Sequence, residues 1–284
     1  MSGAVSWRKV SDRHARILHE AWSAANETGI SPRFHHAHTT TAGSQYFKNH
    51  STPRILVVGN EGALRYCKED SHPNAGLWKC PDCRAGISAK SSKDIQTYWV
   101  DKLERYAVEA AAGEIAGDED PFSEQTTAWW RGIYLLSRAI QDRGWRLRFR
   151  EEETLANVDP PSIVDARRVL RRIAWANLFR YSYVWRGKAR ERSDQRTARE
   201  DALNRAVCGL LATEIEALSP DYVLFLTASA PTYLIESVVG AQSRTWGDFE
   251  MLRNRSGVVA FRLQHPQGWS HADMYATARA IRQY

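Results

Sequence analysis

The stretch Ile55-Leu56-Val57-Val58-Gly59-Asn60-Glu61-Gly62 decides how the chain is expected to fold. It begins with a continuously apolar run, which is typical of a strand buried on both faces of a parallel sheet. Gly59 ends the run, and polar residues follow at once. Ligands of open α/β sheets bind beyond the carboxyl ends of the strands, so residues 59–62 are expected to lie at the functional edge.

Similar apolar runs recur along the chain and alternate with helical patterns. Strands are expected at 173–176, 222–226 and 258–261, with a weaker candidate at 146–150. Helices are expected at 11–25, 94–111, 124–143, 163–172, 198–218, 231–239 and 270–283. This alternation predicts an α/β fold, with three α/β/α layers around a central, mostly parallel sheet.

The 284 residues suffice for one large domain with a buried core. Residues 1–53 are expected to form an N-terminal extension. Residues 54–284 are expected to form the α/β domain, with a Cys-rich insertion at about 67–86. No apolar run reaches the length of a membrane span and no signal-peptide pattern is present, so we expect a cytoplasmic protein without membrane contact. No obligate protein partner is evident.

The net charge of +6 permits a polyanionic partner without requiring one. A stretch rich in arginine and aromatic residues, 180–199, directly follows Asn177. Four of its cations are expected to contact DNA phosphates: Arg180, Arg186, Lys188 and Arg190. The alternative is a charged helix face that Glu191 and Asp194 balance.

Three strand ends carry the side chains that base excision requires. Glu61, Asn177 and His265 each follow an expected strand, so a parallel sheet would bring them to one edge. A carboxylate stabilises the cationic sugar, an amide reads the base edge, and an imidazole stabilises the departing base. Each residue also has a structural explanation: a helix cap for Glu61, a loop contact for Asn177, and a hydrogen-bonded structural histidine for His265.

The ordered set resembles the uracil-DNA glycosylase superfamily over roughly residues 54–284. Gly59 to Gly62, Asn177, and His265 to Ser270 are similar to that family's strand-end motifs in type, order and position. Gly76-Leu77-Trp78-Lys79-Cys80 is similar to the segment of thymine-type members that stacks an aromatic ring on the base.

The resemblance implies a role for each matching residue. Glu61, with Asn60 beside it, would activate water and His265 would stabilise the leaving base, while Gly59, Gly62 and Asn177 would hold the base. Trp78 or Leu77 would stack on it. Gln267, Trp269 and Ser270 would contact DNA, with Trp269 as the wedge that fills the gap left by the flipped nucleotide. Chemistry of this type needs no cofactor.

One departure from the family bears on the substrate. Uracil-specific members place Pro-Tyr after the catalytic position, and the tyrosine bars a substituent at C5 of the base. Here Gly62-Ala63 stands in that place. The open side fits a C5-substituted cytosine in double-stranded DNA, such as the glucosylated hydroxymethylcytosine of phage DNA that antiviral members of the superfamily excise.

Other functions stay open at this point. The chain is compatible with a uracil or thymine-mismatch repair glycosylase, and with a non-catalytic DNA-binding protein of the same fold. A dinucleotide-binding enzyme is disfavoured, because residues 59–62 lack the Gly-x-Gly-x-x-Gly spacing that cradles a pyrophosphate.

Four residues have the makings of a structural zinc site: Cys67, His72, Cys80 and Cys83. A second paired motif is absent, so reduced cysteines packed in a loop are the alternative. The fourth cysteine, Cys208, falls in an apolar helical pattern and is expected in the core.

Overall fold

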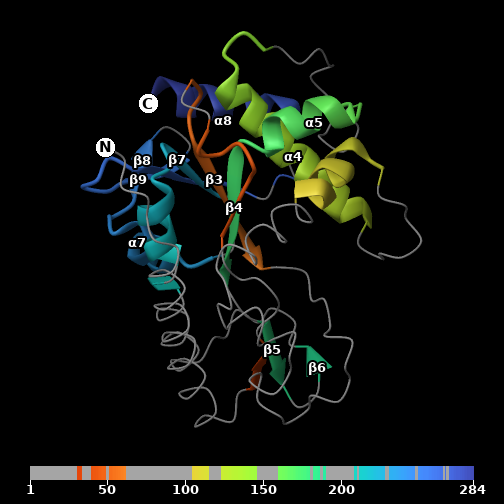
Figure 1. Ribbon diagram of the computed structural model, residues 1–284. Helices are drawn as coiled ribbons and strands as arrows, with labels where there is room; N and C mark the ends of the chain where they lie inside the picture. The colour runs from red at the N-terminus through yellow and green to blue at the C-terminus, as the bar shows by residue number, and fades with distance from the viewer. Residues whose placement is uncertain are drawn as a thin grey trace.

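The computed structural model describes residues 31–33, 40–48, 51–61, 104–114, 123–145, 159–179, 182–185, 188–189, 208–209, 211–227, 230–246, 249–264, 266 and 269–284. These residues form a mixed α/β fold with a seven-stranded and a three-stranded sheet (Figure 1). The expectation of an α/β protein is thus confirmed.

Four parallel strands form the centre of the larger sheet, whose order is β2-β4-β3-β7-β10-β9-β8. They are β4 (Ile173–Phe179), β3 (Ile55–Glu61), β7 (Tyr222–Phe225) and β10 (Val259–Arg262). β3 lies between β4 and β7, and its register pairs Gly59 with Asn177 and Val58 with Phe225. Continuous apolar runs suit these strands because helices cover both faces.

The edges of this sheet are antiparallel, unlike its centre. On one side β2 (Thr41–Ala42) pairs with β4. On the other side β9 (Phe249–Arg253) joins β10 to β8 (Arg244–Trp246). The expected parallel sheet is therefore right for the four central strands and wrong for the edges.

The order of the central strands creates a topological switch point. The chain passes from β3 to β4 on one side, and then crosses to β7 on the other side of β3. In such sheets the connections after the two strands leave in opposite directions and open a crevice at their carboxyl ends. The fold thus directs attention to the ends of β3 and β7.

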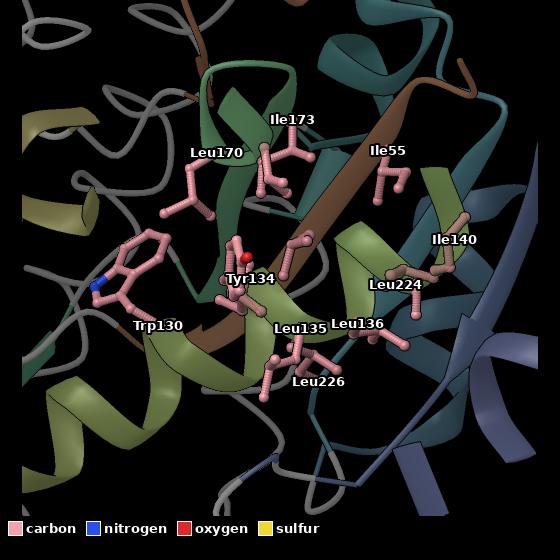
Figure 2. Packing of buried hydrophobic residues seen from close by; sticks show 14 of the residues in the cluster. Ile55, Trp130, Tyr134, Leu135, Leu136, Ile140, Leu170, Ile173, Leu224 and Leu226 are labelled. Atoms are coloured by element: carbon pink, nitrogen blue, oxygen red, sulfur yellow. The ribbon is translucent and has the colours of Figure 1, made fainter. Parts of the chain in front are cut away.

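One face of the sheet is covered by α4 (Ser123–Gln141), α5 (Ile163–Leu170), α8 (His271–Gln283) and the helix at 104–112. Trp130, Tyr134 and Leu135 project from α4 into a cluster with Ile55 and Ile173 of the strands (Figure 2). Nearly all of α4 from residue 130 is buried, including Arg131, whose pKa burial lowers against the opposing charge of Asp159.

The opposite face packs against α7 (Thr232–Val239) and the helix at 211–218. Leu56 and Val58 alternate with Ile55 and Val57 along β3 and belong to this second cluster. Cys208 is fully buried there, as expected. Helices on both faces make the three-layer arrangement.

Residues 40–48 belong to the α/β domain, although they were expected in the N-terminal extension, residues 1–53. Tyr46 is fully buried, and this burial raises the pKa of its hydroxyl. Gly43 lies so close to the backbone that a Cβ on it would be 2.4 Å from the carbonyl oxygen of Arg171. Thr40 donates from its backbone N–H and its hydroxyl to the buried carboxylate of Glu214.

The smaller sheet consists of β1 (Ser31–Arg33), β5 (Ser182–Trp185) and β6 (Lys188–Ala189), all antiparallel. In Figure 1 it lies beyond the carboxyl ends of β3 and β4, whose arrowheads point toward it. No helix in the described part of the chain is long and apolar enough to cross a membrane.

Candidate functional site at the carboxyl edge of the sheet

An amide, an indole and a glycine meet at the carboxyl ends of β3 and β4. A Cβ added to Gly59 would lie 3.1 Å from Oδ1 of Asn177 and 3.2 Å from Cζ2 of Trp129. Asn177 comes from the neighbouring strand, where it pairs with Gly59, and Trp129 reaches the edge from α4. Glycine at position 59 thus lets both side chains close over the strand.

Within the described residues, the Asn177 side chain makes no hydrogen bond, and it is only partly buried. A loop-fixing asparagine would satisfy at least one of its donors and acceptors locally. The free amide therefore counts against a purely structural role for Asn177.

Trp129 and Trp130 are adjacent on α4 but have different surroundings. Trp130 is 8% exposed and packs edge-to-face on Trp175, with ring centroids 5.7 Å apart. Trp129 is partly buried, packs against the same core cluster and also approaches Gly59. The indole of Trp129 thus lies where the core meets the carboxyl edge of the sheet.

Asn60 and Glu61, the expected catalytic residues, are the last two residues of β3 and do not follow the strand as expected. β3 continues past Gly59 to Glu61, which pairs in register with Phe179 of β4. Strand pairing fixes the backbone of Asn60 and Glu61 beside the end of β4. Their side chains, and Gly62, lie outside the described residues.

Thr227 stands at the carboxyl end of β7 with an unused hydroxyl. It is 1% exposed, and its Oγ1 has no hydrogen-bond partner in the described part of the chain. The N–H of Leu226 donates to Val58 O at 2.9 Å, which keeps this segment beside β3. A buried hydroxyl without a partner carries a desolvation cost of about 1–3 kcal/mol, so it calls for an explanation.

Arg262, at the end of β10, holds the connection between β7 and α7. Its guanidinium donates to Thr232 Oγ1 at 2.6 Å, to Glu250 Oε2 at 2.7 Å and to Ala230 O at 2.8 Å. These hydrogen bonds join the end of β10 to β9, to the first turn of α7 and to Ala230 just before it.

Four residues expected in the DNA-binding site come from the segment after β10, and the structure describes two of them. His265 and Gln267 lie outside the described residues. Trp269 is 4% exposed and belongs to the core cluster, so the expected wedge role does not fit this structure. Ser270 is the N-cap of α8: its hydroxyl accepts from the N–H of Asp273, and Asp273 accepts from the N–H of Ser270. The capping box gives Ser270 a structural role at the start of α8, and its expected DNA contact stays a prediction.

The basic stretch after Asn177 contains the paired strands β5 and β6, while Glu191 and Asp194, on which the alternative of a charged helix face depends, lie outside the described residues. β5 and β6 pair Trp185 with Lys188, which leaves residues 186–187 as a two-residue connection. Lys188 is therefore on a strand, while Arg180, Arg186 and Arg190 lie outside the described residues. A hairpin that follows Asn177 after a few residues stays near the candidate site.

The expected zinc ligands Cys67, His72, Cys80 and Cys83 and the expected stacking residue Trp78 also lie outside the described residues. Among the residues that are described, no group of His, Cys, Asp and Glu could hold a metal ion.

Three residues that shape the edge were not expected from the sequence: Trp129, Thr227 and Arg262. Trp129 had no signal of its own, because the sequence does not show which tryptophan of the adjacent pair reaches the end of β3. Thr227 had one, since it directly follows an expected strand. Arg262 had none, because its three acceptors come together only in the folded chain.

Comparison of the chain with family models, with curated proteins and with solved structures finds no match. The chemistry of the site must therefore be argued from its own residues. A partly exposed amide beside an indole can read and stack a flat heterocycle, and a carboxylate position follows on the same strand.

Proposed function

We propose that the protein is a monofunctional DNA glycosylase, which flips a modified pyrimidine out of double-stranded DNA, excises it and leaves an abasic site. The observation that carries the proposal is the contact of Gly59 with Asn177 and Trp129. It supports a slot in which a base stacks on an indole while an amide reads its Watson–Crick edge.

The positions of the strand ends suit this reaction. Glu61 ends β3 and His265 follows β10, with β7 between them. Two strand spacings amount to about 10 Å, which accommodates a nucleoside between the two groups. We assign Glu61, aided by Asn60, to stabilise the cationic sugar and direct a water molecule to its C1′. We assign His265 to stabilise the anionic base as the N-glycosidic bond breaks.

The favoured substrate is a C5-substituted cytosine such as glucosylated hydroxymethylcytosine, and the favoured role is defence against phage DNA in the cytoplasm. Gly62-Ala63 supports this choice because neither residue has a side chain that would bar a C5 substituent. The Asn177 amide can accept from and donate to cytosine in one orientation and to uracil in the other, so it does not exclude uracil or thymine.

A base-release assay tests the proposal. Purified protein is incubated with duplexes that contain uracil, a thymine mismatch, hydroxymethylcytosine or its glucosylated form, and freed bases are identified by mass spectrometry. We expect release of one base, reduced by roughly 10²- to 10⁴-fold in Glu61→Gln and in His265→Ala. The control is Glu216→Gln, an exposed carboxylate on the helix at 211–218, which should release the base at the wild-type rate.

Failure has a defined meaning in this assay. If no base is released but DNA binding is retained, the protein is a non-catalytic DNA-binding protein or its substrate is a modification outside the four tested. If Glu61→Gln and Glu216→Gln release bases equally fast, the site assignment is wrong.

A further inference from the structure

Arginines gather on the outer side of α5, far from the candidate site. Residues 164, 167, 168 and 171 recur at helical spacing and therefore share one side of α5. Val164, Arg167, Arg168 and Arg171 line an open surface hollow. Arg172 follows directly, and α5 leads into the amino end of β4. We call Arg167, Arg168 and Arg171 the α5 arginine patch.

The patch has few acidic neighbours in the described part of the chain. Asp165 lies 3.6 Å from Arg168, but it also lies 3.4 Å from Arg138, so one carboxylate serves two cations. Glu104, near the same edge, accepts from the N–H of Ser44 at 2.8 Å. Neither Arg167 nor Arg171 has an ion pair with a described acidic residue.

Arg171 contributes one buried and several outer N–H groups. Its Nε is buried and has no hydrogen-bond partner among the described residues. Because this atom is closed to solvent, an anion in the hollow would bind the outer N–H groups, and the side chain would have to shift before Nε gained an acceptor.

The alternative explanation of the α5 arginine patch is that its cations stabilise the helix, since cations near a helix C-terminus contribute about 0.3–1 kcal/mol. That effect needs cations close to the last carbonyl groups. It gives no reason for an arginine-lined hollow or for a buried unpartnered Nε.

Phosphate is the acceptor chemistry that fits the patch best. Guanidinium groups bind phosphates bidentately, and neighbouring positions on a helix are about 5–6 Å apart, close to the spacing of successive phosphates. A protein partner would require an apolar centre to the interface. Val164, at 66% exposed, is the only apolar residue among those described that line the hollow.

We propose that the α5 arginine patch binds the phosphate backbone of a second DNA duplex. The patch lies at the amino edge of the sheet and Asn177 at the carboxyl edge, four residue steps, or about 13 Å of strand, along β4 from Ile173. A duplex held at the carboxyl edge, which rests on the proposed function, leaves the patch free. One molecule would thus bridge two DNA segments without base specificity.

A bridging assay tests this proposal. An immobilised unmodified duplex is loaded with protein, and capture of a second, fluorescent duplex is measured. The test variant is Arg167→Gln/Arg171→Gln. The control is Arg244→Gln/Arg255→Gln, which removes two exposed arginines elsewhere. Both lower the net charge equally, from 39 − 33 = +6 to 37 − 33 = +4.

We expect the test variant to lose bridging by about tenfold or more and the control to retain it. The slope of log K against log[salt] for the second duplex should become shallower by about 1.8, because two phosphate contacts at about 0.9 each are lost. Since Arg171 is half-buried, Arg167→Glu at an exposed position gives a second test that spares the fold.

Three results would overturn the proposal: no capture by the wild type, equal capture by test and control variants, or displacement of the second duplex by polyglutamate as readily as by DNA. Base release from a short duplex should be unchanged in the test variant. Loss of bridging with normal base release, or the converse, therefore separates this proposal from the proposed function.

Discussion

The two edges of the central sheet differ in how their polar groups are used. At the amino edge, polar groups of the strand ends hydrogen-bond to one another. Asp221 accepts from the N–H of Arg54 at 2.7 Å, and Arg54 O accepts from the N–H groups of residues 221 and 222. At the carboxyl edge, Asn177 and Thr227 offer polar atoms without a partner in the described residues. The hydrogen bonds at the strand ends thus stabilise the amino edge, beside which the α5 arginine patch lies on the outer side of its helix, and the unpartnered groups at the carboxyl edge support the proposed base binding there.

The largest expected effect is on base release. Asn177→Ala removes the amide that would read the base, and two hydrogen bonds at about 0.5–1.5 kcal/mol each correspond to a loss of roughly 5- to 150-fold. The unfolding free energy should hardly change, because the side chain has no described partner to lose. Single-turnover base release and denaturant unfolding measure the two quantities.

Gln45→Ala is the matched control from the amino edge, because it also truncates a partly exposed amide. It should leave base release at the wild-type rate. An equal loss of activity in both variants would mean that the two edges do not differ in function.

A smaller effect distinguishes two buried threonines. Thr40→Val removes a hydroxyl that donates to buried Glu214 and should lower the unfolding free energy by about 1–3 kcal/mol. Thr227→Val removes a hydroxyl with no described partner and should leave stability unchanged or slightly higher. Urea unfolding of the two variants checks the contrast, and a comparable loss in both would show that Thr227 has a structural partner.

The smallest effect is expected at the exposed ion pair of the amino edge. Arg54 Nε and Asp221 Oδ2 are 3.8 Å apart, and the Asp221 side chain is 51% exposed. Water screens such a pair, so Asp221→Asn should cost less than about 1 kcal/mol and have no effect on base release. A shift in thermal midpoint of more than a few degrees would show that this edge depends on charge more than its exposure implies.

The central strands and most helices were predictable because their signals are local. Apolar runs such as Ile55 to Val58 stay buried in any parallel sheet, and the helical periodicity of 163–172 and 270–283 closely matches α5 and α8. The antiparallel edges were not predictable, because the two residues of β2 become a strand only through pairing with β4. Likewise, the basic stretch after Asn177 carries charges in a pattern that does not distinguish a helix from the β5–β6 hairpin.

The candidate site was predictable in position but only partly in composition. Asn177 and Glu61 follow from the rule that polar residues after parallel strands meet at one edge. Trp129 enters from a helix far along the chain, and its place depends on tertiary packing. Trp269 differs in the opposite direction: its place in the loop predicted a DNA contact, but its indole is buried in the core.

The most direct test of the central claim compares two glycines. In Gly59→Ala the new Cβ would crowd Asn177 and Trp129 at 3.1 and 3.2 Å, and in Gly43→Ala it would meet the carbonyl oxygen of Arg171 at 2.4 Å. Single-turnover base release per folded molecule should fall roughly tenfold or more in Gly59→Ala, with little loss of stability. Gly43→Ala should lose about 1–3 kcal/mol of stability and keep the wild-type rate. Normal base release in Gly59→Ala, or a slow rate in Gly43→Ala, would contradict the placement of the active site at the carboxyl edge.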